Sequence, residues 1–250
     1  MKNLLESGRS IICIGPSFPS PELVEFLGYL TFDAVFIDAE HGVIGPEKAQ
    51  EMVRAANVVG MATMTRVPKN DPAVILSYLE TGTKCVLVPH VTTAAEAQEA
   101  VRAAMYHPKG IRGSHSGTRA ANYGVTQTGE EYFTRANRET AVAVMIEDVS
   151  AVENIEEIVS VPGVDACMLG PGDLSMSMGY PGQPNHPEVQ AMVEQAFQKI
   201  RQAGVAAGTV AGDGAHVRRL FDHGYQMAIV SASVLLAGAA RQLISTARES

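Results

Sequence analysis

The feature that most constrains this sequence is the regular alternation of short apolar runs with longer amphipathic segments along its whole length. Most of the runs lack the polar–apolar alternation of a half-exposed strand, so the predicted strands are apolar on both faces. They are Ile11–Gly15, Ala34–Asp38, Ala62–Arg66, Cys85–Val88, Ala141–Ile146, Ala166–Leu169, Ala206–Val210 and Met227–Val230. Such strands are typical of a parallel sheet covered by helices.

The segments between these runs carry the start and stop signals of helices. Proline stands in the predicted first turn in Ser20–Glu22 and His186–Glu188, where its missing N–H has no intrahelical partner to lose. Gly60 and Gly224 follow predicted helix ends. Eight strands with helical crossovers in 250 residues predict an α/β fold, one (β/α)₈ or TIM barrel domain over residues 1–250. An open doubly wound sheet is the alternative, but no GxGxxG follows the first strand.

The charge balance excludes several classes of partner. Nineteen Lys plus Arg against 27 Asp plus Glu give a formal net charge of −8, whereas nonspecific binding to nucleic acids or anionic membranes needs a basic surface. Cys13, Cys85 and Cys167 are far apart and are predicted to be buried, reduced thiols. Residues 1–15 show no secretory signal. We therefore expect a cytoplasmic protein without a nucleic-acid or membrane partner.

One segment interrupts the alternation between the fourth and fifth predicted strands. Residues 106–140 include a run that is incompatible with a helix, His107–Gly113, and they concentrate basic side chains in an acidic chain. These side chains are Lys109, Arg112, Arg119, Arg135 and Arg138. Loops this long in compact domains are usually functional or disordered. Two interpretations remain open: an anion-receiving lid over the barrel mouth, and a solvated segment or subunit contact.

Polar residues gather at the carboxyl ends of five consecutive predicted strands, where (β/α)₈ barrels place their catalytic groups. They are Asp38, Glu40 and His41 after the second strand, Arg66 at the third, His90 after the fourth, Glu147 and Asp148 after the fifth, and Asp173 after the sixth. The opposite rim receives mostly Gly, Asp and Thr. The sequence therefore predicts one active site at the carboxyl-terminal rim.

The chemistry of these residues indicates metal-assisted catalysis. Glu147 and Asp173 would supply hard oxygen ligands suited to Mg²⁺ or Mn²⁺, although both could instead cap the helices that follow them. His41 beside Asp38 has the arrangement of a general base with an orienting carboxylate. Arg66 could stabilise a developing oxyanion or enolate. None of the six lysines ends a predicted strand, so a Schiff-base mechanism is disfavoured.

Several linked motifs resemble the HpcH/HpaI aldolase family, the metal-dependent (class II) pyruvate aldolases. The motifs are Phe36–Gly42, Thr65–Pro68, Val86–Pro89, Tyr106–Gly113 and Leu169–Ser175. They occur in order over almost the whole chain. The resemblance is strongest to the branch of 4-hydroxy-2-oxoheptane-1,7-dioate and 2-keto-3-deoxy-sugar-acid aldolases. It implies a (β/α)₈ barrel that exchanges its last helix between partners and forms dimers or hexamers.

The resemblance also implies roles for individual residues. Glu147 and Asp173 would hold Mg²⁺, Mn²⁺ or Co²⁺, which pyruvate chelates through its carboxylate and keto oxygen. Arg66 would bind the keto oxygen and steady the enolate, and His41, paired with Asp38, would take part in proton transfer. Backbone amides at Gly172 and Asp173 would hold the pyruvate carboxylate.

The chain departs from the family pattern at two positions beside the expected pocket. Met145 stands where relatives usually have a glutamine that borders pyruvate, and His90 stands where many have methionine. Arg119 is retained and could bind substrate. We expect reversible cleavage of a 4-hydroxy-2-oxo acid to pyruvate and an aldehyde through a metal-bound enolate. The alternatives are oxaloacetate decarboxylation, a thioester lyase reaction, and a pyruvate-binding barrel without turnover.

Overall fold

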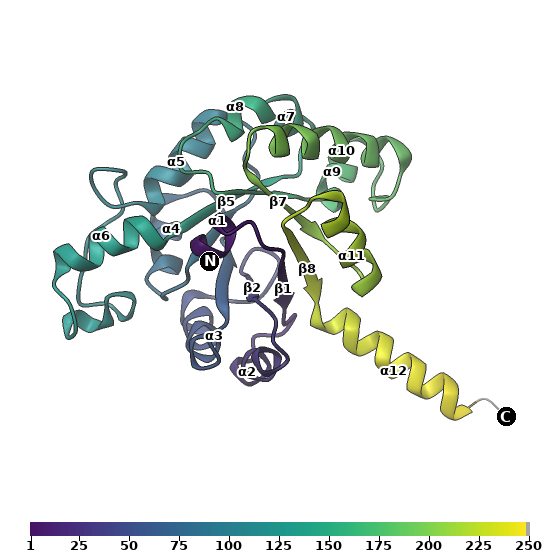
Figure 1. Cartoon of the computed structure of the whole chain (residues 1–250), viewed down its shortest axis with the longest axis horizontal. Helices are drawn as coiled ribbons and strands as arrows, with labels where there is room; N and C mark the ends of the chain where they lie inside the picture. Colours follow the sequence, from purple (N-terminus) through teal and green to yellow (C-terminus); the bar gives the residue numbers. More distant parts are fainter. Residues whose placement is uncertain (249–250) are drawn as a thin grey trace.

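The computed structural model describes residues 1–248 and contains a closed barrel of eight parallel strands in sequence order (Figure 1). The strands are β1 (Ile11–Gly15), β2 (Ala34–Asp38), β3 (Ala62–Arg66), β4 (Cys85–Val88), β5 (Ala141–Ile146), β6 (Ala166–Leu169), β7 (Ala206–Val210) and β8 (Met227–Ser231). The predicted bounds agree for β1 to β7, and β8 extends one residue further. The predicted (β/α)₈ barrel is confirmed.

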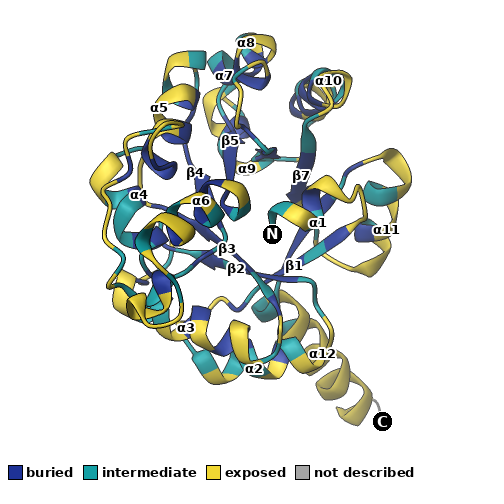
Figure 2. Cartoon of the chain, turned by 60° about the vertical axis from the view of Figure 1, so that its left-hand side comes forward, coloured by how far each residue is buried: buried dark blue, intermediate teal, exposed yellow. Residues whose placement is uncertain are grey.

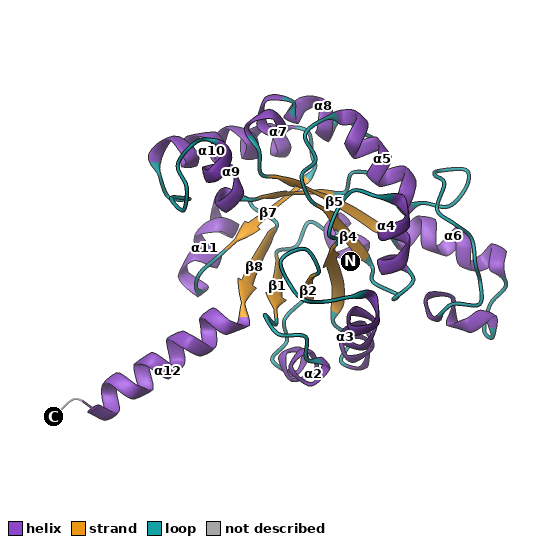
Figure 3. Ribbon diagram, turned by 180° about the vertical axis from the view of Figure 1, so that it is seen from behind, coloured by secondary structure: helices purple, strands orange, loops and turns teal. Residues whose placement is uncertain are grey.

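Helices surround the strands, as Figure 3 shows. They are α1 (Lys2–Glu6), α2 (Pro21–Tyr29), α3 (Pro46–Val58), α4 (Pro72–Leu79), α5 (Ala94–Ala104), the 3₁₀ segment η1 (Arg119–Gly124), α6 (Gly129–Glu139), α7 (Val149–Glu153), α8 (Ile155–Val159), α9 (Pro171–Ser177), α10 (Pro187–Gln202), α11 (Gly214–His223) and α12 (Ala232–Arg248). The predicted helix starts and stops are capped as expected. Ser20 Oγ accepts the Leu23 N–H at 3.1 Å at the start of α2, and Gly224 caps the end of α11 with φ +112°.

Strand residues alternate between two apolar layers. On β5, Ala141, Ala143 and Met145 belong to the cluster inside the barrel, whereas the residues between them pack against the helices. This pleat explains why the strands are apolar on both faces. It also places the residue two positions after Met145, which is Glu147, above the barrel interior at the carboxyl-terminal end.

Residues 106–140 lie at the amino-terminal end of the barrel, away from the predicted mouth. The reason is connectivity: α5 returns the chain to the amino-terminal ends of the strands before the segment begins. Arg119 Nη1 donates to the carbonyl oxygen of Thr81 at 2.8 Å, and Thr81 lies before β4. Arg112 is buried and pairs with Glu80 at 2.8 Å. Of the two interpretations left open, a lid over the chain's own barrel mouth does not fit this placement, and a subunit contact remains a prediction.

The last helix, α12, extends away from the barrel (Figure 1). None of its described residues is buried, and Figure 2 shows almost its whole surface as exposed. Val234, Leu236 and Leu243 are 51%, 65% and 70% exposed. The helix thus presents apolar side chains that nothing within residues 1–248 covers.

Two further expectations concern the chain as a whole. Cys13, Cys85 and Cys167 are all buried and unpaired, as predicted, and burial raises the pKa of each thiol. Over the described residues, 1–248, the structure has no helix with the length and apolarity needed to cross a bilayer.

Candidate active site

The candidate site lies at the carboxyl-terminal ends of three strands, where the side chain at or directly after the end of each strand points into the barrel. Asp38 is the last residue of β2 and Arg66 the last of β3, and the strand register pairs them directly. Glu147 follows β5 on the inward side. The closed barrel therefore brings to one rim three residues that are far apart in the sequence.

A bidentate ion pair connects Arg66 to Asp38. Arg66 Nε donates to Asp38 Oδ1 at 2.9 Å and Nη2 donates to Oδ2 at 2.6 Å. Burial alone would raise the pKa of Asp38, but the hydrogen bonds and charge of Arg66 outweigh it and leave the pKa below its usual value. Burial likewise opposes the charge on Arg66, and the acids around it raise its pKa. Both groups are thus charged, and the fork fixes the guanidinium plane.

The position of His41 differs from the expected pairing with Asp38. The backbone N–H of His41, not its ring, donates to Asp38 Oδ1 at 3.3 Å. The ring is 61% exposed, and its Nε2 lies 3.9 Å from Glu40 Oε2. The expected Asp38–His41 ring pairing is therefore not formed, because the Asp38 carboxylate is occupied by Arg66. The part that His41 takes in proton transfer stays a prediction.

Glu40 and His90 link the two halves of the site, and Glu40 was predicted as one of the polar residues at the rim but not as a partner of Arg66. Its Oε2 forms an ion pair with Arg66 Nη1 at 3.1 Å, and its Oε1 lies 3.1 Å from His90 Nε2. The His90 backbone N–H donates to Glu147 Oε1 at 2.9 Å. His90 has φ +53°, a left-handed conformation that is uncommon for a residue other than glycine. The signal that points to Arg66 is that Glu40 follows Asp38 at the same parity, so that both can face the barrel axis.

Glu147 is the residue whose surroundings most need a cation. Its side chain is 1% exposed, and its Oε2 has no hydrogen-bond partner. Burial raises the pKa of Glu147, the negative charges of Glu40 and Asp173 raise it further, and His90 opposes them. A buried carboxylate without compensation is costly, so these residues fit a bound cation. No cluster of three or more His, Cys, Asp or Glu suited to a metal occurs within residues 1–248.

Asp173 and Gly170 belong to the next strand and helix. Asp173 lies in the first turn of α9, and its charge acts on Glu147. A Cβ at Gly170 would come within 2.8 Å of Glu147 Cβ and 3.0 Å of Met145 Cε. Glycine is thus required at position 170, because Met145 and Glu147 occupy the space that a side chain would need. Met145, which replaces the expected glutamine, is buried beside Glu147.

A cavity of about 480 Å³ opens beside the Asp38–Arg66 ion pair. Asp38, Arg66 and Phe36 form one wall, and the ends of β7 and β8 form the other. Val234 of α12 also contributes to the lining. The cavity therefore has one polar side, formed by Asp38 and Arg66, and one mainly apolar side. Its volume is sufficient for a small organic acid.

Fold and site define a (β/α)₈ barrel protein in which three carboxyl groups, those of Asp38, Glu40 and Glu147, surround one arginine at the carboxyl-terminal rim. The sequence profile of the HpcH/HpaI aldolase/citrate lyase family matches residues 17–238. The chain belongs to this family, and the predicted membership is confirmed.

Individual relatives agree with this assignment. A hydroxypyruvate/pyruvate aldolase of Sagittula stellata is 37% identical, over 92% of this chain and 89% of its own. A 4-hydroxy-2-oxo-heptane-1,7-dioate aldolase of Shigella sonnei is 38% identical, over 97% of this chain and 92% of its own. The crystal structure of an HpcH/HpaI aldolase/citrate lyase family protein from Burkholderia cenocepacia superposes with a TM-score of 0.94 at 30% identity. It covers 99% of this chain and 98% of that one.

The structure brings most of the predicted site residues together. Asp38, Arg66, Met145, Glu147 and Asp173 meet at one rim, with Gly172 in the first turn of α9. Arg119 does not join them, since it lies with Thr81 at the opposite end of the barrel. Within one chain the expected contact of Arg119 with substrate is therefore not possible.

Proposed function

We propose that this protein reversibly cleaves a 4-hydroxy-2-oxo acid to pyruvate and an aldehyde, with a divalent cation held by Glu147 and Asp173. The reaction class is supported by the family and by relatives named as aldolases. The observation that carries the site is the buried, unpartnered Oε2 of Glu147 beside a second carboxylate. Mg²⁺, Mn²⁺ and Co²⁺ all suit such oxygen ligands.

Each residue of the site has a separate role in the proposed reaction. When bound, the cation supplies positive charge that stabilises the oxyanion of the enolate. Arg66, oriented by Asp38, binds the keto oxygen and stabilises the same charge. His41, exposed at the mouth, moves the proton of the pyruvate methyl group. Backbone N–H groups of Gly172 and Asp173, unpaired in the first turn of α9, bind the pyruvate carboxylate.

Deuterium exchange at the pyruvate methyl group tests this proposal without knowledge of the aldehyde. In D₂O we expect the protein to accelerate exchange, observed by proton NMR. Exhaustive chelation should abolish the exchange, and Mg²⁺, Mn²⁺ or Co²⁺ should restore it. Exchange that persists in protein shown to be free of metal would contradict the proposed role of Glu147 and Asp173.

The same preparation separates the other reactions of a pyruvate enolate. Release of pyruvate from 4-hydroxy-2-oxo acids should exceed its release from oxaloacetate, and it should also exceed the cleavage of 3-hydroxyacyl thioesters to an acetyl thioester and a carbonyl compound. Calorimetric binding of pyruvate without methyl exchange would instead indicate a barrel that binds pyruvate and does not turn it over.

We also propose that α12 packs on a second copy of this chain in a dimer or hexamer. The support is its exposed apolar side chains, since contiguous apolar patches of soluble proteins usually mark contact surfaces. Replacing Leu236 and Leu243 together with glutamate should reduce the assembly to a smaller species in light scattering. Gln242→Glu on the same helix is the control and should leave its mass unchanged. A monomeric wild-type chain would overturn the proposal.

A cytoplasmic location is part of the same proposal. Three unpaired, buried thiols are the arrangement expected in a reducing compartment.

A further inference from the structure

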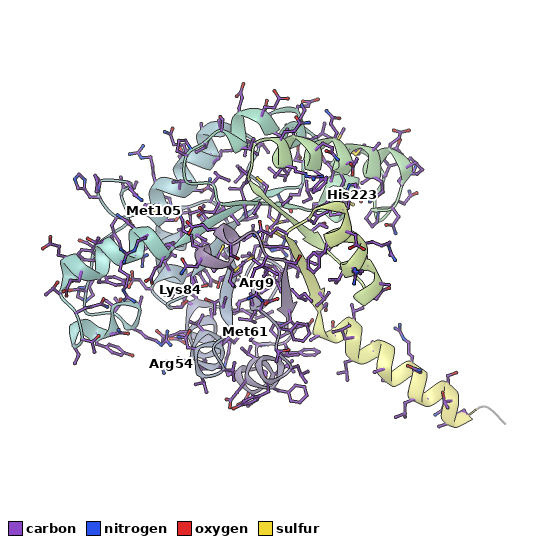
Figure 4. All side chains as sticks on the ribbon, in the orientation of Figure 1. Arg9, Arg54, Met61, Lys84, Met105 and His223 are labelled. Carbon is purple, nitrogen blue, oxygen red and sulfur yellow. The ribbon has the colours of Figure 1, made fainter. Side chains whose placement is uncertain are left out.

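A second cavity lies at the amino-terminal end of the barrel, opposite the candidate active site. Its volume is about 490 Å³, and it is lined by α3, by the residues before β4, and by η1 and α6. Its cationic side chains are those of Arg54, Lys84, Arg119 and Arg135. Figure 4 shows Arg54 on α3 and Lys84 near β4, on the side of the molecule that carries α6. The catalytic proposal uses none of these side chains.

The backbone around the cavity is shaped to hold Arg119. Gly82 adopts φ +92°, and a Cβ there would come within 2.6 Å of Arg119 Nη1. Glycine at this position therefore gives the guanidinium room to reach the Thr81 carbonyl oxygen, 2.8 Å away. On the other side, Asn122 and Tyr123 also take left-handed conformations, with φ +51° and +57°, and both line the cavity.

The positive charge of the cavity is incompletely balanced. Glu139 is the acid that pairs with its cations, lying 3.4 Å from Lys84 Nζ and 3.7 Å from Arg135 Nη1. Among residues 1–248, no carboxylate lies within 4.0 Å of the Arg54 or Arg119 guanidinium nitrogens. Arg135 Nε is buried without a hydrogen-bond partner. Burial lowers the pKa of Arg119, and the charge of Arg54 lowers it further.

We infer that this cavity binds a multivalent oxyanion, either a phosphate or a polycarboxylate, through Arg54, Arg119 and Arg135. Guanidinium groups match both classes of anion by bidentate hydrogen bonding. An anion would relieve the repulsion between Arg54 and Arg119. The Tyr123 hydroxyl, 3.4 Å from Arg54 Nη2, and the Asn122 side chain add neutral polar groups. A volume of about 490 Å³ accommodates a small metabolite.

Calorimetry on the full-length, metal-free protein tests this site separately from catalysis. Inorganic phosphate and pyrophosphate form one set of probes, and tricarballylate forms the other. We expect one set to bind, with a Kd at least tenfold weaker in Arg54→Gln and in Asn57→Glu. Both substitutions alter exposed lining residues, so folding should be retained. Arg218→Gln is the matched control, because Arg218 lies on α11 and pairs with Asp222.

The outcomes decide the inference in both directions. Tighter binding of the phosphate probes would identify a phosphorylated ligand, and tighter binding of tricarballylate would identify a polycarboxylate. The inference is overturned if neither set binds, including the case in which a neighbouring subunit closes the cavity. It is also overturned if Arg54→Gln and Asn57→Glu bind as tightly as Arg218→Gln. Methyl exchange by pyruvate does not enter this test, so the two proposals stand or fail independently.

Discussion

Replacing Arg66 with alanine is expected to slow deuterium exchange at the pyruvate methyl group by about 10²–10³-fold, the usual effect of removing one oxyanion donor. Arg66 is the one guanidinium in the described site, and it stands among Asp38, Glu40 and Glu147. Its loss removes the proposed donor to the keto oxygen and leaves Asp38 without the two hydrogen bonds that Arg66 donates. The measurement is the NMR exchange rate with metal at saturation.

Arg66→Lys distinguishes charge from geometry. Lysine keeps the positive charge but cannot form the fork to Asp38, because an ammonium group has no planar pair of donors. We expect Arg66→Lys to recover only part of the lost rate. Wild-type exchange in Arg66→Ala, with pyruvate still bound, would refute the assignment.

Glu147→Gln is expected to lower metal affinity and activity but to raise the thermal stability of the metal-free protein. The neutral amide should weaken binding of Mn²⁺ at least tenfold and reduce methyl exchange to the background rate. In metal-free protein, however, the variant should melt at a higher temperature than the wild type. The reason is that the amide removes a buried charge that Glu40 and Asp173 repel.

Asp148→Asn provides the matched control for this pair of measurements. Asp148 is adjacent in sequence, but its carboxylate caps α7 by accepting the Ser150 N–H at 2.9 Å. Asparagine caps helices about as well, so Mn²⁺ affinity should remain that of the wild type. Equal loss of Mn²⁺ affinity in both variants, or no loss in Glu147→Gln, would remove Glu147 from the proposed site.

The strands could be predicted from the sequence because each is a short run that is apolar on both faces. A run such as Ala141–Ile146 is apolar at both parities, which only a strand covered on both faces tolerates. Once the strands are known, the barrel fixes which residues end at the rim. Asp38, Arg66 and Glu147 could therefore be placed together without any knowledge of side-chain conformation.

The contacts within the site were less predictable, because they depend on competition between neighbours. The Asp38 carboxylate was within reach of both His41 and Arg66, and the guanidinium fork prevails. The bridge from Glu40 through His90 to Glu147 depends on the unusual φ of His90, for which the sequence has no signal. The interpretation that placed Arg119 near the mouth of its own barrel fails for a different reason: α5 carries the chain to the amino-terminal end of the barrel before this segment begins.

The projecting α12 contributes Val234 to the lining of the candidate cavity, so the proposed packing of this helix on a second copy bears on the site. A single helix of 17 residues is marginal in water when it has nothing to pack against, and Val234 of this helix lines the same space as Arg66. If α12 packs on a second copy, as proposed above, the order of that part of the wall will depend on protein concentration. Turnover per chain should be read at several protein concentrations before any difference between variants is assigned to a side chain.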